Sequence, residues 1–266
     1  MEKETKLVKK LKRLLKRLGM PRWLHRYGPK SYELVHHLAG LLIRAYAHLS
    51  YRRVVKLFDL LGIKCPSKSA LQYTAAKLNT NFWSRILKST SGQTYIAAID
   101  GTGFSRTHPS YYYLKRIDGK MPRVPVKMSV AFDTRKKKFC AAKLRVLASH
   151  DIKDAKTLIK KSKPKILVAD KAYDALWLHQ FCSQRKIKAH IPLRKWSKPR
   201  FKNMGARMKA AKHFRTRTYH RRELVEASFS SIKRKYGTSV SSRSARTIRA
   251  ELYGRLACHN IFSFKI

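Results

Sequence analysis

Two acidic residues each end an apolar run, where a carboxylate is costly to bury unless it meets a cation. Asp100 follows the run 96–99 and is followed by Gly-Thr-Gly, and Asp170 follows the run 166–169. If the two runs form parallel neighbouring strands, both acids lie at one edge of the sheet and can share two hard divalent metal ions. Such ions, roughly 3.5–4 Å apart, suit in-line attack on a phosphodiester. The pair therefore predicts metal-dependent phosphoryl chemistry.

A third acid, Glu226, lies in the segment 219–236, which has helical periodicity. One apolar face suited to docking on a sheet is formed by Val225, Phe229, Ile232 and Tyr236. A second stripe is rotated by about 80° around the helix axis from this apolar face. It combines an acid with a phenol, a guanidinium and an amine, namely Glu226, Tyr219, Arg222 and Lys233. Alone, this pattern favours an ordinary surface helix with its charges in water. Together with Asp100 and Asp170 it favours a metal ligand flanked by phosphate-binding cations.

Other acidic residues have simpler interpretations. Asp151, Asp154 and Asp174 lie near predicted helix starts, where a carboxylate satisfies free backbone amides. Asp133 is typical of a turn, and Glu251 lies in a helix-like stretch that predicts no special role.

At this point the chain resembles a known family. Tyr219, Arg222, Glu226 and Lys233 match the Y-(2)-R-(3)-E-(6)-K signature of the DDE transposases of bacterial and archaeal insertion sequences. Residues 98–102 resemble the first-Asp motif of that family, and residues 168–174 resemble the second. The resemblance covers about residues 91–266, with a looser likeness in the N-terminal helices. Each motif alone is weakly specific, but all three in order are a specific match.

The resemblance implies an RNase H-like fold that brings Asp100, Asp170 and Glu226 together around two Mg²⁺ ions, with Mn²⁺ as a substitute. In the family, the metals activate water to nick the transposon end, and the released 3′-hydroxyl then attacks target DNA. Hydrolysis and strand transfer are both in-line displacements at phosphorus, so one two-metal centre can serve both.

The resemblance also implies DNA partners, namely the terminal inverted repeats of the transposon and the target DNA. Arg222 and Lys233 are expected to bind phosphates of the transposon ends, supported by Tyr219, and Trp196 is a candidate for stacking on a displaced base. A homodimer on DNA is expected because two transposon ends must be held at once.

The hydrophobic pattern of the chain after residue 91 predicts the strands and helices that position these residues. Apolar, β-branched runs alternate with helical periodicity in the order β-β-β-α-β-α-β, which predicts a mixed α/β fold with helices covering a sheet. The ranges are strands at 94–100, 124–133 and 139–147, a helix at 151–161, a strand at 166–170, a helix at 174–185 and a strand at 188–192.

Residues 1–90 predict an all-α, helix-turn-helix-like domain. Two short helices flank Gly62, and Lys68 and Gln72 lie on the exposed side of the second, which suits contact with DNA. A plain helical hairpin explains the same pattern equally well. Residues 3–18 predict a helix with one apolar and one basic face, which either packs on the body of the protein, the favoured interpretation, or lies on a membrane surface.

The charge balance favours a polyanionic partner. Lys and Arg number 62 against 14 Asp and Glu, a formal net charge of +48. Such a field attracts nucleic acid and argues against a metabolic enzyme for small neutral substrates. Residues 193–222 carry twelve Lys and Arg, no acid and interleaved aromatic residues. They favour a surface that tracks a nucleic-acid backbone over a merely solvated charged face.

The four cysteines form no C-x-x-C pair, which predicts reduced, buried thiols. The start of the chain lacks the pattern of a signal peptide, which predicts an intracellular protein. The resemblance to the transposases implies a cytoplasmic, nucleoid-associated location in a prokaryote.

The sequence thus predicts a DNA transposase with a helical DNA-binding domain at 1–90 and an RNase H-like DDE catalytic domain at 91–266. Two alternatives remain at this point. One is a catalytically silent basic nucleic-acid-binding protein, and the other is an RNase H-like nuclease that cuts but does not join.

Overall fold

The centre of the protein is a five-stranded mixed sheet with the strand order β3-β2-β1-β4-β5. The structure, a computed structural model, describes residues 5–25, 27, 30–106, 116, 125–147, 149–194 and 205–262. β1 pairs antiparallel with β2 and parallel with β4, β2 pairs antiparallel with β3, and β4 pairs parallel with β5. The strands are β1 (Ile96–Phe104), β2 (Val126–Asp133), β3 (Lys138–Arg145), β4 (Ile166–Ala169) and β5 (Lys188–His190). This arrangement confirms the predicted mixed α/β class.

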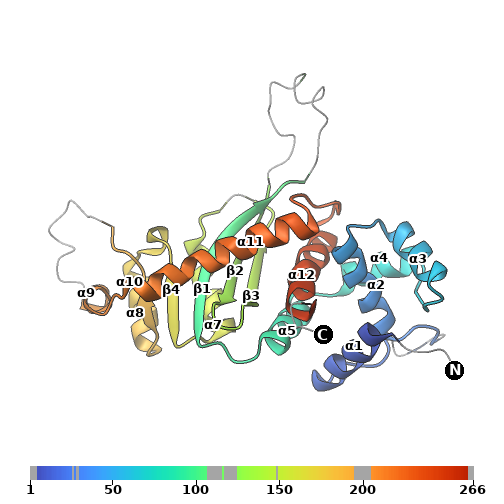
Figure 1. Cartoon of the computed structure of the whole chain (residues 1–266), viewed down its shortest axis with the longest axis horizontal. Coiled ribbons are helices and arrows are strands. Elements are labelled where there is room, and N and C mark those ends of the chain that lie inside the picture. Colours follow the sequence, from blue (N-terminus) through green and yellow to red (C-terminus); the bar gives the residue numbers. More distant parts are fainter. Residues whose placement is uncertain are drawn as a thin grey trace.

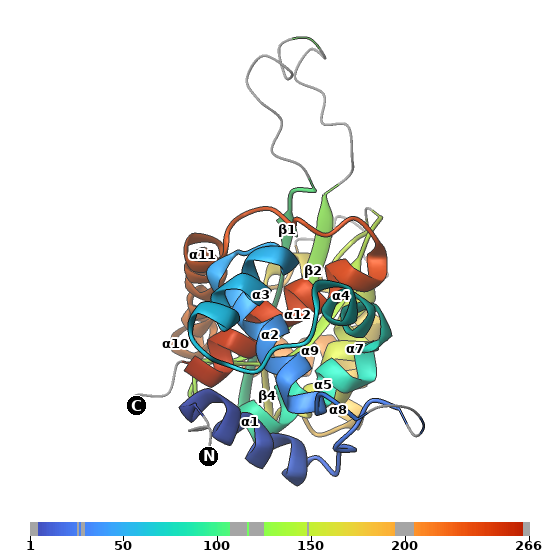
Figure 2. The same ribbon diagram turned by 90° about the vertical axis from the view of Figure 1, so that its right-hand side faces the viewer.

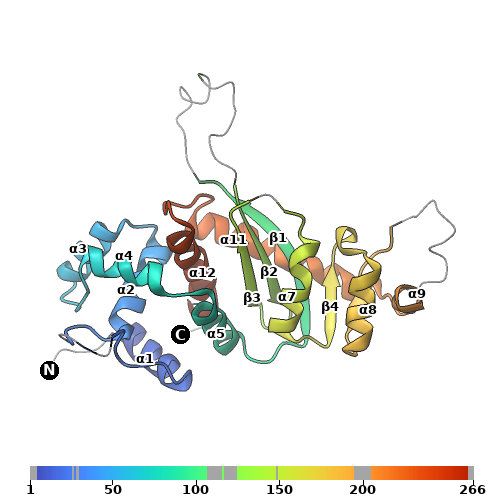
Figure 3. The same cartoon turned by 180° about the vertical axis from the view of Figure 1, so that it is seen from behind.

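Helices cover both faces of the sheet (Figures 1 and 3). Alternate residues of a strand point to opposite faces. Ile99 packs in a cluster with α7 (Ile152–Ser162) and α8 (Leu176–Gln184). Its neighbour Ala98 packs in the cluster that includes α11 (Glu223–Tyr236) and α12 (Ala245–Phe262). The two sides of β1 therefore belong to two different cores.

The N-terminal helices pack against the α12 end of the sheet (Figures 1 and 2). They are α1 (Lys6–Arg17), α2 (Leu34–Ala47), α3 (Tyr51–Leu60), α4 (Lys68–Lys77) and α5 (Thr80–Ser91). Ser50 and Ser67 cap α3 and α4 with their hydroxyl groups, and Gly62 takes the left-handed conformation (φ 61°) in the turn between them. α1 buries its apolar face against the body of the protein, which confirms the favoured interpretation of that helix.

The segment 219–236 is not one continuous α-helix, as the predicted stripe assumed. Tyr219 ends α10 (Thr216–Tyr219), and a 3-10 turn, η3 (His220–Arg222), leads into α11. The apolar face was predicted correctly, since Val225, Phe229 and Ile232 are buried. The remaining short elements are α9 (Gly205–Lys212) and the 3-10 helix η1 (Lys171–Tyr173).

A buried ion-pair cluster joins the N-terminal helices to α12. Glu251 accepts hydrogen bonds from Arg44 of α2, from Arg255 of α12 and from the backbone amides of Ser241 and Ser242. Its side chain is 3% exposed, and the side chains of Arg44 and Arg255 are 7% and 1% exposed. The prediction that Glu251 has no special role was wrong, because its partner Arg44 lies 207 residues away in the sequence, whereas Arg255 lies one turn farther along the same face of α12.

All four cysteines are free thiols, and Cys140, Cys182 and Cys258 are buried, as predicted. Burial raises the pKa of the Cys140 thiol to about 11, which keeps it protonated. Over the ranges that the structure describes, none of the helices has the length and apolar character needed to cross a membrane.

Candidate active site

Asp100 and Asp170 occupy equivalent places on neighbouring parallel strands. In the β1–β4 register Ile99 lies opposite Ala169. Asp100 is the next residue of β1, and Asp170 directly follows the end of β4. Ile99 and Ala169 both pack in the core under α7 and α8, so the alternation of strand side chains directs Asp100 and Asp170 to the α11 face. The parallel pairing on which the sequence argument depended is confirmed.

Glu226 is linked to this edge of the sheet by the side chain of Arg222, which lies near both Glu226 and Asp100. The 3-10 turn η3 crosses both β1 and β4, and α11 runs on from it along β1 (Figure 1). Arg222 forms an ion pair with the Glu226 carboxylate, and its Nη1 lies 4.0 Å from Oδ2 of Asp100. One guanidinium therefore lies between two of the predicted metal ligands.

The carboxyl group of Asp100 is in an environment that favours the protonated form. Burial raises its pKa above the ordinary value, and the nearby carboxylates of Glu226 and Asp151 raise it further. The backbone amide of Gly101, which donates to Oδ1 at 2.8 Å, and Arg222 act in the opposite direction. A bound cation would relieve this electrostatic cost.

Across the described part of the chain, no group of three His, Cys, Asp or Glu side chains is close enough to hold a metal ion. The positions of Arg222 and Glu226 explain this. Glu226 is turned toward the guanidinium, and its side chain is 50% exposed. The structure thus places Asp100 and Asp170 at the ends of neighbouring parallel strand segments, and it places Glu226 near Asp100 with the guanidinium of Arg222 between them.

An orphaned hydroxyl group lies close to these acids. Tyr173 of η1 is 1% exposed, and among the described residues its buried hydroxyl has no hydrogen-bond partner. Burial raises the pKa of Tyr173, and the carboxylates of Asp151, Asp100 and Asp170 raise it further, so the phenol stays protonated among several acids. A buried donor without a partner is uncommon in native structures and marks room for a water molecule or a hydrated ion. This observation and the all-carboxylate donor set both fit hard divalent cations.

The other predicted site residues lie at different distances from this centre. The guanidinium carbon of Arg222 lies 5.9 Å from the centre of the Tyr219 ring, so Tyr219 borders the site. Lys233 lies farther along α11, with its Nζ 5.6 Å from the ring centre of Phe104 at the end of β1. Lys68 and Gln72 are exposed on α4, at the other end of the molecule (Figure 1). Trp196 lies outside the described residues.

Asp151 belongs to the neighbourhood of the site, which the sequence argument missed. It precedes α7 but makes no capping hydrogen bond, contrary to its predicted role. Its carboxylate forms an ion pair with Lys127 at 3.0 Å and packs on Gly101, directly after Asp100, where any Cβ atom would collide with it. The only indication in the sequence was the glycine that follows Asp100, which allows a second carboxylate to approach the strand.

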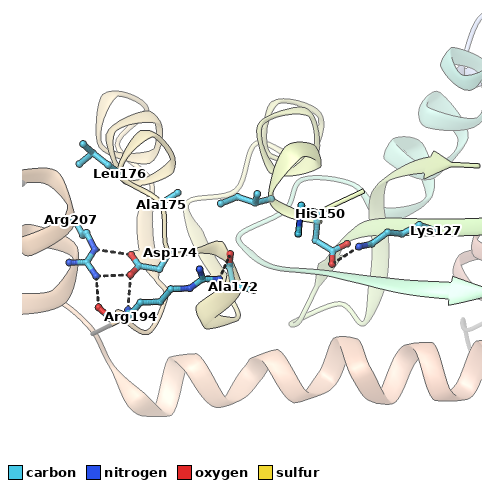
Figure 4. A pocket seen from close by; sticks show the side chains of 10 residues that line it. Lys127, His150, Ala172, Asp174, Ala175, Leu176, Arg194 and Arg207 are labelled. Atoms are coloured by element: carbon cyan, nitrogen blue, oxygen red, sulfur yellow. Dashed lines mark hydrogen bonds and ion pairs between the residues drawn. The ribbon is translucent and has the colours of Figure 1, made fainter. Parts of the chain in front are cut away.

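A cavity of about 470 Å³ opens beside Asp151 on the α7 and α8 side (Figure 4). Asp174 lies at its far end, where Arg207 donates two hydrogen bonds to the carboxylate and the backbone amide of Arg194 donates a third at 2.7 Å. Burial alone would raise the pKa of Asp174, but Arg207, Arg194 and His179 together hold it below the ordinary value. Asp174 therefore binds Arg194, after β5, and Arg207 of α9. The prediction that Asp174 satisfies free amides at a helix start was wrong, because the N-cap of α8 is Ala175.

The chain is similar to known transposases in sequence and, weakly, in structure. A family model described as "Transposase DDE domain" matches residues 91–261, a range that contains Asp100, Asp170 and Glu226. Among solved structures, a piggyBac transposase synaptic complex with hairpin DNA is 11% identical, with a TM-score of 0.46, over 97% of this chain and 72% of that chain. A Mos1 transposase paired-end complex with left transposon end is 13% identical, with a TM-score of 0.25, over 97% of this chain and 89% of that chain. Both structural likenesses are weak, so the assignment depends on the family match.

Proposed function

The chain belongs to the transposase DDE domain family, and on that premise we propose that it is a DNA transposase that binds transposon ends, cleaves them and joins them to target DNA by a cut-and-paste route. The observation that carries the proposal is the register of the parallel strands β1 and β4, in which Ile99 pairs with Ala169 and the two acids Asp100 and Asp170 follow directly, with Glu226 linked to Asp100 through Arg222. Residues 91–266 supply this catalytic centre, and residues 1–90 supply the helices that recognise DNA.

Asp100, Asp170 and Glu226 are the residues that would hold two divalent metal ions, Mg²⁺ or Mn²⁺ in its place. When bound, such ions supply Lewis-acid activation of the attacking oxygen and stabilise the charge that develops at phosphorus. The chain contributes three carboxylates at one edge of the sheet and the buried, protonated hydroxyl of Tyr173 beside them.

Arg222 has two tasks in this proposal. In the arrangement described here it neutralises Glu226 and lies near Asp100, which limits the repulsion between the two acids. Its side chain is 20% exposed, so it can also donate to a phosphate that approaches the acids from solvent. Lys233, on the helix α11 that follows the turn η3, extends this cationic line toward the end of β1.

DNA is the proposed partner, as terminal inverted repeats and as target. The net charge of +48 supplies long-range attraction to the phosphate backbone, and the exposed face of α4 with Lys68 and Gln72 is the proposed contact to the repeats. A homodimer on DNA and a cytoplasmic, nucleoid-associated location belong to the same proposal.

Arg222→Ala is expected to weaken the binding of transposon ends and to reduce cleavage together. The loss of one phosphate contact should lower the slope of log K against log salt by about 0.9. Salt titrations of binding and a cleavage assay measure the two effects on the same preparation. Arg135→Ala, which removes an exposed arginine in the turn between β2 and β3, is the matched control. A loss of thermal stability in Arg222→Ala without any change in the salt slope would contradict the phosphate contact.

A product gel separates the proposed function from its alternatives. A transposase yields joined strand-transfer products from DNA that carries the element's ends. Nicked products alone would instead indicate a nuclease on the same fold. Salt-dependent binding without any metal-dependent product would indicate a silent nucleic-acid-binding protein.

A further inference from the structure

A second cavity, of about 740 Å³, lies where the N-terminal helices meet the start of α12. Its walls come from the end of α2, the start of α3, one residue of α4, the loop that leads into α12 and the first turn of α12. These elements lie together at the end of the molecule that faces the viewer in Figure 2. The cavity is thus remote from the acidic centre and borders both parts of the protein.

The lining of this cavity is cationic and rich in hydroxyl groups. None of the described residues that form its walls is acidic. The groups best suited to bind an anion are those of Arg44, Arg53, Arg243, Ser242, Ser244 and Thr247. α3 and α12 both begin at the cavity, so the positive ends of two helix dipoles add to the side-chain charge.

The buried cluster behind the cavity carries more positive than negative charge. Arg44 and Arg255 share the single carboxylate of Glu251, and all three side chains are more than nine-tenths buried. Within the described part of the chain, the Nε atom of Arg44, a wall residue, has no hydrogen-bond partner, and neither has the buried hydroxyl of Tyr51. Buried charges are normally matched one for one, because an unpaired charge is costly. An anion in the cavity would supply the missing negative charge.

The surroundings of the cavity indicate which anion this is. Gln72 of α4 lines the cavity and is exposed on the same helix as Lys68, so a ligand that lies along α4 also passes over the cavity. Arg53 and Arg243 are exposed at its walls, where an extended polyanion can reach them. A DNA duplex has both properties, because its backbone presents phosphates in a continuous row.

We propose that this cavity binds a backbone phosphate of the DNA that contacts α4, a contact that rests on the proposed function of the protein. Such a contact carries no sequence information but fixes the position of the duplex. Because the walls come from α2, α3, α4 and α12, the bound phosphate ties the DNA-binding helices to the helix that packs against the catalytic sheet.

The test uses the full chain without metal and a short random-sequence duplex. The double variant Arg53→Gln, Arg243→Gln removes two exposed cations of the cavity and leaves the buried cluster intact. We expect the slope of log K against log salt to fall by about 0.9 for the lost phosphate, with the melting temperature unchanged. The matched control is Arg185→Gln, Lys186→Gln, two exposed cations that follow α8 at the other end of the molecule. It should keep the wild-type slope.

An unchanged slope in the double variant, or an equal fall in the control, would overturn the proposal, because the cations would then act only as diffuse charge. A second arm compares inorganic phosphate with chloride at equal ionic strength. If phosphate raises the melting temperature of the wild type while the DNA slope is unaffected by the double variant, the site takes a small anion and the DNA assignment is wrong. The salt titration measures binding and not cleavage. A failure of this proposal can therefore be distinguished from a failure of the proposed transposase activity, which the product gel measures.

Discussion

Asp100→Asn is expected to abolish metal-dependent cleavage. The substitution removes one of the two carboxylates that the parallel pairing of β1 and β4 brings together. Loss of a direct metal ligand should exceed the roughly 10–100-fold loss of activity typical of outer-shell partners. DNA binding should be unchanged or tighter, because one negative charge is removed from a surface that attracts phosphates. A cleavage assay and a binding titration on the same preparation measure both effects.

The matched control for Asp100→Asn is Asp59→Asn, which makes the same change at an exposed position of α3. It should leave cleavage at the wild-type level. Cleavage by Asp100→Asn at the rate of this control would end the assignment of Asp100 to the metal site.

Glu251→Gln is expected to lower the free energy of unfolding by about 3–5 kcal/mol, because it leaves two buried guanidinium groups without their carboxylate. The cluster joins α2 to α12, so the loss affects the contact between the helical part and the sheet. Urea unfolding near neutral pH measures the change. Glu223→Gln is the matched control, because its contact with His220 lies at the surface, where the two side chains are 69% and 60% exposed, and such surface pairs contribute about 0–1 kcal/mol.

The stabilisation by Glu251 should depend on pH in a defined direction. Burial alone would raise the pKa of this carboxyl group, but Arg44, Ser242 and Arg255 outweigh burial and hold the pKa below the ordinary value of 4.5. Its contribution is therefore complete above about pH 4.5 and is lost as the pH falls through the lowered pKa of the folded state. The difference between the wild type and Glu251→Gln should accordingly shrink in acid. A difference below about 1 kcal/mol at neutral pH, as for a surface pair, would contradict the account.

The order of strands and helices in the catalytic part could be predicted from local patterns. Each strand was a short apolar run, and each helix had an apolar face, so local sequence was sufficient. The meeting of Asp100 with Asp170 followed only on the condition that their strands are parallel neighbours. The pairing of Ile99 with Ala169 meets that condition.

Contacts between distant segments could not be predicted in the same way. Asp151 and Glu251 had ordinary local interpretations, and their partners Lys127 and Arg44 lie far away in the sequence. The prediction of one continuous helix containing Glu226 was wrong at the start of the segment for a different reason. The angular argument assumed a continuous α-helix, whereas the turn at 220–222 is a 3-10 helix with a different number of residues per turn.

The most direct test of the central claim is a titration of cleavage and joining with Mg²⁺ and with Mn²⁺, on DNA that carries the element's own ends. Wild type is compared with Glu226→Gln and with Glu223→Gln, whose carboxylate lies one turn away and contacts His220. The account predicts metal-dependent joined product from the wild type and from Glu223→Gln, and none from Glu226→Gln. Joined product from Glu226→Gln at the wild-type level, or tight DNA binding with no product from any of the three proteins, would contradict it.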